Sequence, residues 1–135
     1  MSTFLLEIVT PERKVYEQEA NMIIVKGVEG EMGILPHHIP LVTPLKIAPV
    51  IVKKSQGEEL VAVNGGFMEV RKEKVVILAE SAELAVDIDV ERALAAKKRA
   101  EERLADKRRE EIDFRRAELA LQRALNRIEV AERRR

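Results

Sequence analysis

The sequence predicts an α+β protein, with a β-sandwich followed by an antiparallel two-helix hairpin. Two observations predict this order. All five prolines and all six glycines lie within the first 66 residues, so obligatory turns are confined to the first half. In the second half, residues 88–103 and 112–127 are identical at eight of sixteen positions and lack both breakers, which is typical of two related helices. The predicted domains are therefore 1–85 and 86–135.

Short apolar runs rich in Val and Ile predict the strands of the first half. The runs are TFLLEIV (3–9), NMIIVKG (21–27), PVIVKK (49–54), ELVAV (59–63) and KVVILAE (74–80). SQGEE (55–59) and RKEK (71–74) are typical of hairpin turns. Closely spaced strands with no helical period between them favour a sandwich or a flattened barrel.

The helices of the second half are predicted from their first residues. Asp89 and Asp113 are suitable N-caps, since a carboxylate accepts the unpaired N–H groups of a first turn. The stretch DKRREE (106–111) is expected to form the bend between them. Because this stretch contains no Gly or Pro, one long continuous helix is a second possible state of the hairpin.

The repeat places alanine and arginine on separate stripes, because residues 7 and 11 apart point in nearly the same direction on a helix. The arginine stripes are Arg92, Arg99, Arg103 and Arg116, Arg123, Arg127; the alanine stripes are Ala93, Ala96, Ala100 and Ala117, Ala120, Ala124. An alanine seam allows close approach but buries little area, so the hairpin should be weakly held. The arginines fit two hypotheses: a solvated face paired with Glu, or a site for phosphates. The repeat alone favours the solvated face.

Composition and charge exclude several classes of protein. Residues 1–87 carry 9 basic and 13 acidic side chains, whereas 88–135 carry 15 and 11, which favours an interaction arm. The chain has no cysteine, and its two histidines are adjacent at His37 and His38, so we expect no metal site. No apolar run reaches the roughly 20 residues of a membrane span, and the N-terminus has no signal-peptide pattern.

The same residues bear on three other functions. The sequence offers no nucleophile with a base, no metal cluster and no phosphate loop, so we expect no catalytic site. An Arg-rich nucleic-acid module is the main alternative, but the net charge is zero and aromatic residues are only 3% of the chain. A coiled-coil adaptor is the other alternative, although sustained heptads are missing.

Several motifs together resemble one family. GEMGILPHHIPL (30–41), NGGFMEV (64–70) and VVILAESAE (75–83) resemble the ε subunit of bacterial F-type ATP synthase, of the kind found in Bacillus. IVTPERKVYE (8–17) is similar to that family's first hairpin, and IDVERA (88–93) resembles its ATP-binding motif. The resemblance extends in order along essentially the whole chain.

The resemblance implies a sandwich of about ten short strands and a non-catalytic rotor subunit. Such a subunit binds γ and rests on the c-ring at the cytoplasmic face of the cell membrane, as a peripheral protein that is monomeric when isolated. Its helical arm either folds on the sandwich or extends towards the α/β hexamer, where it inhibits ATP hydrolysis. No cofactor is required; ATP is a regulatory ligand of the folded arm, and Mg²⁺ can accompany it but is not needed.

The resemblance also implies which residues form these sites. The expected ATP ligands are Glu83, Ile88, Asp89, Arg92, Ala93, Arg99, Arg123 and Arg127. The expected contacts to the c-ring are Glu31 and His38. One position departs from the family, which usually has Gly where this chain has His37. Since Gly is favoured where φ is positive, the backbone conformation at residue 37 is the point to examine.

Overall fold

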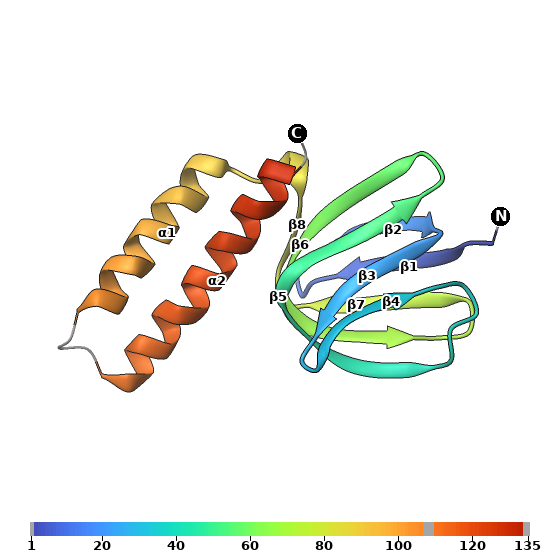
Figure 1. The fold of residues 1–135 in the computed structure, drawn as a ribbon, viewed down its shortest axis with the longest axis horizontal. Helices are drawn as coiled ribbons and strands as arrows, with labels where there is room; N and C mark the ends of the chain where they lie inside the picture. The colour runs from blue at the N-terminus through green and yellow to red at the C-terminus, as the bar shows by residue number, and fades with distance from the viewer. Residues whose placement is uncertain (1, 107–109, 134–135) are drawn as a thin grey trace.

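A computed structural model describes residues 2–106 and 110–133 as a β-sandwich with a two-helix arm beside it, which confirms the predicted fold class (Figure 1). The strands are β1 (Phe4–Val9), β2 (Lys14–Ala20), β3 (Met22–Gly27), β4 (Gly30–Ile34), β5 (Leu41–Lys54), β6 (Gly57–Val70), β7 (Lys74–Ala79) and β8 (Ala82–Leu84). A short 3-10 helix, η1 (Ala85–Asp87), leads to α1 (Val90–Ala105) and α2 (Glu111–Arg133). Of the bend predicted at 106–111, residues 107–109 lie outside the part described.

Eight strands are described where about ten short ones were expected, because β5 and β6 each run through both layers. The first half of β5 and the second half of β6 pair in one layer with β7, β1 and β2. The other halves pair in the second layer with β8, β3 and β4. Each layer therefore contains five strand segments, and ten segments result if the halves are counted separately.

The crossover between the layers depends on glycine. The β5–β6 ladder is interrupted between the pairs Leu45↔Gly66 and Ile47↔Asn64, and Gly65 and Gly66 have φ of 83° and 134° there. A Cβ on Gly66 would lie 2.1 Å from the backbone oxygen of Leu78. No other residue fits so close to a neighbouring strand, so the bend is fixed at this position.

The sandwich core is aliphatic and contains no arm residue among those described. Fully buried members of this core include Leu6, Ile8, Ile23, Val52, Val61, Met68 and Ile77. The whole cluster comes from the strands, together with the partly buried Val15, Met32, Leu41 and Leu84 that pack against it. The sandwich thus has the hydrophobic core that an independently folding domain needs.

The arm has the predicted seam but only one of the two predicted caps. Asp89 caps α1, since its Oδ1 accepts from the backbone N of Arg92 at 3.0 Å. The same prediction for Asp113 is wrong: α2 begins at Glu111, and Asp113 lies within its first turn. Four alanines of the predicted seam, Ala93, Ala100, Ala117 and Ala124, are each at most 3% exposed, whereas Ala96 and Ala120 are only partly buried.

Only α2 makes extensive contact with the sandwich. α1 packs on the side of α2 that faces away from the sandwich (Figure 1). α2 packs across β5 and β6. A small apolar cluster at its C-terminal end consists of Ala62, Ile88 and Val130, with Leu60, Ala85, Val90 and Ala131 packed against it. This contact is much smaller than the sandwich core, so it is the weaker of the two packings.

Candidate functional site

A cleft of about 670 Å³ lies where the start of α1 faces the end of the sandwich. Its walls come from four parts of the chain: the β1–β2 turn, residues 80–83 before and within β8, one side of α1, and α2. The side chains that give it chemical character are Arg13, Glu80, Ser81, Glu83, Asp87, Asp89, Arg92, Arg99 and Arg127. Only η1 and Ile88 separate β8 from Asp89, the N-cap of α1, so the start of α1 stays close to β8.

Six of the eight expected ATP ligands line this cleft. They are Glu83, Asp89, Arg92, Ala93, Arg99 and Arg127. Ile88 is 9% exposed and packs in the apolar cluster with Ala62 and Val130. It therefore lies behind the cleft surface and does not line the cleft. Arg123 lines a second cleft instead, one turn earlier on α2 than Arg127.

Two of these six side chains already bind one another. Nε of Arg127 donates to Oε1 of Glu83, which links α2 to β8. Both side chains are roughly one-third exposed, so solvent screens this ion pair only partly. Asp89 uses one carboxylate oxygen as the cap of α1. Arg92 and Arg99 are exposed on α1, and both line the same cleft.

The charge of the cleft is mixed rather than basic. Its lining includes four guanidinium groups, from Arg13, Arg92, Arg99 and Arg127, and five carboxylates, from Glu12, Glu80, Glu83, Asp87 and Asp89. The difference is one net negative charge at neutral pH. Such a site suits a ligand with both anionic groups and hydrogen-bond donors, because guanidinium groups bind the first and carboxylates accept from the second.

The β1–β2 turn adds residues that sequence reasoning missed. Thr10 closes this turn: its N–H donates to the oxygen of Arg13 at 2.9 Å, and its Oγ1 accepts from the N–H of Arg13 at 3.2 Å. Arg13 is thereby brought to a cleft whose lining residues outside this turn and Val15 begin only at Glu80. The sequence holds no signal for this contact except the Thr at a turn.

The second cleft, of about 850 Å³, lies between α2 and the bend of β5 and β6. Its charged lining consists of Lys26, Lys46, Glu80, Arg115 and Arg123. Nη1 of Arg115 lies 3.0 Å from Oε1 of Glu118, within the same helix.

The two expected ring contacts lie at opposite ends of an edge strand. Glu31 is exposed near the start of β4, opposite Lys26 on β3. His38 is half-buried beyond the end of β4, and its Nδ1 is 2.7 Å from the oxygen of Ile39. The two side chains therefore do not form one compact patch. The loop between them exposes Leu35 by 56% and Ile39 by 74%.

His37 adopts the conformation that the family's glycine suggests. Its φ is 68°, and the N–H of His38 donates to the oxygen of Leu35 at 3.2 Å. With Pro36 at its second position, this turn has type II geometry, in which the third residue needs a positive φ. His37 therefore occupies a strained position that glycine would occupy freely.

One outer face of the sandwich exposes large apolar side chains. Val42, Phe67 and Leu78 are 67%, 55% and 54% exposed. Phe67 pairs directly with Leu78, and Val42 pairs with the residue two positions after Phe67, so all three face the same side. We call Val42, Phe67 and Leu78 the outer apolar patch.

Beside this patch, Glu7 is bound by two lysines. Its Oε1 lies 3.0 Å from Nζ of Lys74 and 3.5 Å from Nζ of Lys14. The hydrogen bond from Lys74, more than the charge of Lys14, lowers the pKa of Glu7. Glu7 therefore stays ionised at neutral pH and keeps this end of the face polar.

Between residues 2–106 and 110–133 there is no group of three His, Cys, Asp or Glu side chains placed to hold a metal ion. Within the same ranges, neither helix combines the length and the apolar character that a membrane span requires.

Comparison with known proteins identifies the family. A model described as "ATP synthase, Delta/Epsilon chain, beta-sandwich domain" matches residues 3–85, and the corresponding "long alpha-helix domain" model matches residues 87–132. The chain belongs to the ATP synthase delta/epsilon chain family. An ATP synthase epsilon chain of Halalkalibacterium halodurans is 59% identical over 133 residues, 98% of this chain and 100% of the relative. One of Bacillus velezensis is 57% identical over 131 residues, 97% and 98% of the two chains.

Two solved structures have a similar fold. A chain of the Euglena gracilis mitochondrial ATP synthase (OSCP/F1/c-ring) matches with a TM-score of 0.79 and 23% identity, over 99% of this chain and 82% of that one. A chain of the Tetrahymena thermophila central stalk and c-ring matches with a TM-score of 0.58 and 12% identity, over 96% and 97%. At these identities the likeness concerns the fold alone.

Proposed function

We propose that this member of the ε-chain family is a non-catalytic rotor subunit of a proton-driven F-type ATP synthase. It couples γ to the c-ring as a peripheral protein at the cytoplasmic face of the membrane, and its arm restrains ATP hydrolysis. The family relationship supports the location in the central stalk. The division into a sandwich with its own core and a weakly packed arm supports the two roles.

The outer apolar patch is the proposed contact for γ. Its three side chains are each more than half exposed on adjacent strands of a flat sheet face. Exposed apolar side chains that gather on one face are typical of a protein interface. Glu7 and its two lysines border the patch and supply the polar rim that such interfaces have.

The proposed contact for the c-ring follows the edge from β4 into the next loop. Glu31 presents a carboxylate at one end, and His38 lies past the other end. Between them, Leu35 and Ile39 are exposed in a loop bounded by Pro36 and Pro40. A contact that transmits torque benefits from such a rigid loop, since little motion is lost in bending it.

ATP is the proposed ligand of the 670 Å³ cleft when the arm is docked. Arg92 and Arg99 face the phosphates. Arg127 also binds them when it releases Glu83 and donates to a phosphate oxygen instead. Asp89, through the carboxylate oxygen that does not cap α1, accepts from the sugar or base. Arg123 reaches the phosphates only by turning from the second cleft, where it lies in the structure. Mg²⁺ can accompany the bound ATP in this proposal but is not required.

The arm would then act as a switch set by ATP. The cleft uses walls from both the arm and the sandwich, so ATP stabilises only the docked state. The stabilisation is RT ln(1 + [L]/Kd), or about 1.4 kcal/mol at ten times Kd. That amount shifts the populations about tenfold, which matters only for states that are nearly balanced. The observation that carries this proposal is the small, alanine-based packing of the arm.

Reconstitution tests the proposed function. The catalytic α/β/γ head is assayed for hydrolysis at low and high ATP, with the full chain or with a chain ending at Leu84. We expect the full chain to inhibit at low ATP and much less at high ATP, and the shortened chain to bind without inhibiting. Equal inhibition by both chains would contradict a role for the arm. Failure of both chains to bind the head would contradict the rotor role itself.

A further inference from the structure

The contact between arm and sandwich contains a buried polar pair that the ATP proposal does not use. Asn126, on α2, is 4% exposed; its Nδ2 donates to the backbone oxygen of Val63 at 3.0 Å and to Oδ1 of Asn64 at 3.1 Å. Asn64, on β6, is 1% exposed, and its Nδ2 donates to Oγ of Ser81 at 2.9 Å. A chain of polar side chains therefore runs from the arm into the sandwich.

This pair adds little net attraction. The Val63 carbonyl fixes the orientation of the Asn126 amide, because a carbonyl oxygen can only accept and so must face Nδ2 rather than Oδ1. Oδ1 of Asn126 is then buried, and no donor in the described part of the chain reaches it. A buried acceptor without a donor disfavours docking by an amount similar to the gain from two neutral hydrogen bonds. The pair therefore contributes little to the stability of docking, and its effect is on the position at which the arm docks.

Besides the Arg127–Glu83 ion pair, whose side chains are long and partly exposed, the rest of the contact does not determine a position along α2. Its buried members are Ala62, Ile88 and Val130. Apolar contacts are non-directional, so they tolerate sliding. A slide of one helical turn, about 5.4 Å, would bring Val130 opposite the oxygens of Val63 and Asn64, which then lose the hydrogen bonds from Asn126. The opposite slide would bring the Asn126 amide among the apolar side chains. Both neighbouring registers are penalised.

We propose that the Asn64–Asn126 pair sets the register in which the arm docks on the sandwich. Arg127 follows Asn126 directly, and in this register it reaches Glu83 at the cleft. The pair is thus a positioning element for the cleft, and it does not itself touch the ligand. A buried amide that selects one register at little gain in stability is known from helix pairs. The inference deepens the proposed regulation and rests on the reversible docking of the arm.

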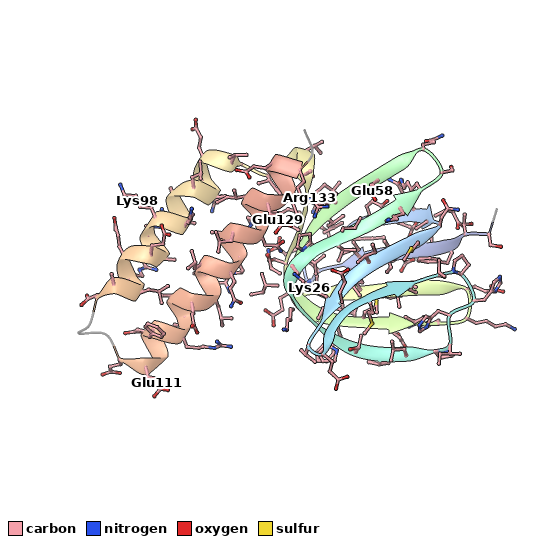
Figure 2. The ribbon with its side chains drawn as sticks, viewed as in Figure 1. Lys26, Glu58, Lys98, Glu111, Glu129 and Arg133 are labelled. Carbon is pink, nitrogen blue, oxygen red and sulfur yellow. The ribbon has the colours of Figure 1, made fainter. Side chains whose placement is uncertain are left out.

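Distance measurements between spin labels test this proposal. The chain has no cysteine, so labels attach only to cysteines introduced at Glu58 on the sandwich and Lys98 on α1, both exposed (Figure 2). Without nucleotide, we expect one dominant, narrow distance in the parent. Asn126→Leu removes the hydrogen bonds to the oxygen of Val63 and to Oδ1 of Asn64, and it should lower the ratio of docked to released arm about tenfold. Asn64→Val with Asn126→Leu should recover part of the docked population with a broader distance distribution.

The matched control is Gln122→Leu, the same change from amide to apolar side chain at an exposed position one turn earlier on α2. It should leave the distances as in the parent. A parental distribution in Asn126→Leu would overturn the proposal, as would a parent with no dominant docked distance. A narrow parental distribution in the double variant would show that apolar packing alone sets the register. Because no ATP is present, failure of the protein to bind ATP in a separate titration contradicts the proposed function and leaves this test intact.

Discussion

Enlarging one alanine of the seam should open the arm without unfolding the sandwich. Ala124 is 0% exposed on α2, and it points away from the sandwich because it lies about 160° around the helix from Asn126. Its side chain therefore faces α1. Leucine adds three carbon atoms where none fit, and overpacking of this kind costs roughly 1–3 kcal/mol. That range corresponds to a factor of about 5 to 150 in the closing equilibrium of the hairpin.

Hydrogen exchange measures this opening. In Ala124→Leu we expect the amides of α1 to exchange faster by about that factor, while those of β1, β6 and β7 exchange as in the parent. ATP binding should weaken in parallel, since Arg92 and Arg99 then move away from Arg127. Ala105→Leu is the control, because Ala105 is exposed at the end of α1. If the α1 amides of Ala124→Leu are as protected as in the parent, the contact between the helices accommodates leucine. The claim that this contact is easily opened would then be wrong.

Three further changes test separate parts of the account. A chain ending at Leu84 should unfold cooperatively on heating, because the sandwich core contains no described arm residue; a gradual transition would contradict independent folding. Glu31→Lys should impair proton-driven synthesis in the whole enzyme more than hydrolysis by the detached head, and equal losses would mark Glu31 as structural. His37→Gly should raise the free energy of unfolding in urea by up to about 1 kcal/mol, since glycine relieves the positive φ; a lower value would refute the strain.

Local patterns predicted both helices and the strands that are rich in Val and Ile, but they did not predict β4, β8 or the joins between some elements. The Val- and Ile-rich runs and the cap at Asp89 follow from short-range chemistry and are found as predicted. The run 49–54 predicted only the second half of β5, which begins at Leu41 and contains both Pro44 and Pro49. Pro44 lies where β5 is the edge of its layer, and Pro49 lies where pairing with β3 is interrupted. Neither proline therefore needs an N–H for the ladder.

The cleft shows the same limit. The helical repeat brought Asp89, Arg92 and Arg99 to one side of α1, since that depends only on helix geometry. The rotation of α2 against the sandwich decides that Arg127 enters the cleft and Arg123 lines the other one. That rotation is fixed by tertiary contacts such as those of Asn126. Helical periodicity carries no information about such contacts.

The most direct test of the central claim is ATP binding to the isolated chain, measured by calorimetry. Asp89→Ala with Arg92→Ala should abolish the binding heat while the melting of the sandwich changes little. Asp89→Ser with Arg92→Ala keeps a helix cap and should also fail to bind, which separates loss of ligand contacts from fraying of α1. Lys98→Ala with Glu102→Ala removes the same two charges from exposed positions outside the cleft lining and should bind as the parent does. Parental binding by the Asp89→Ala, Arg92→Ala chain would show that the arginines are only a solvated face and that ATP does not hold the arm.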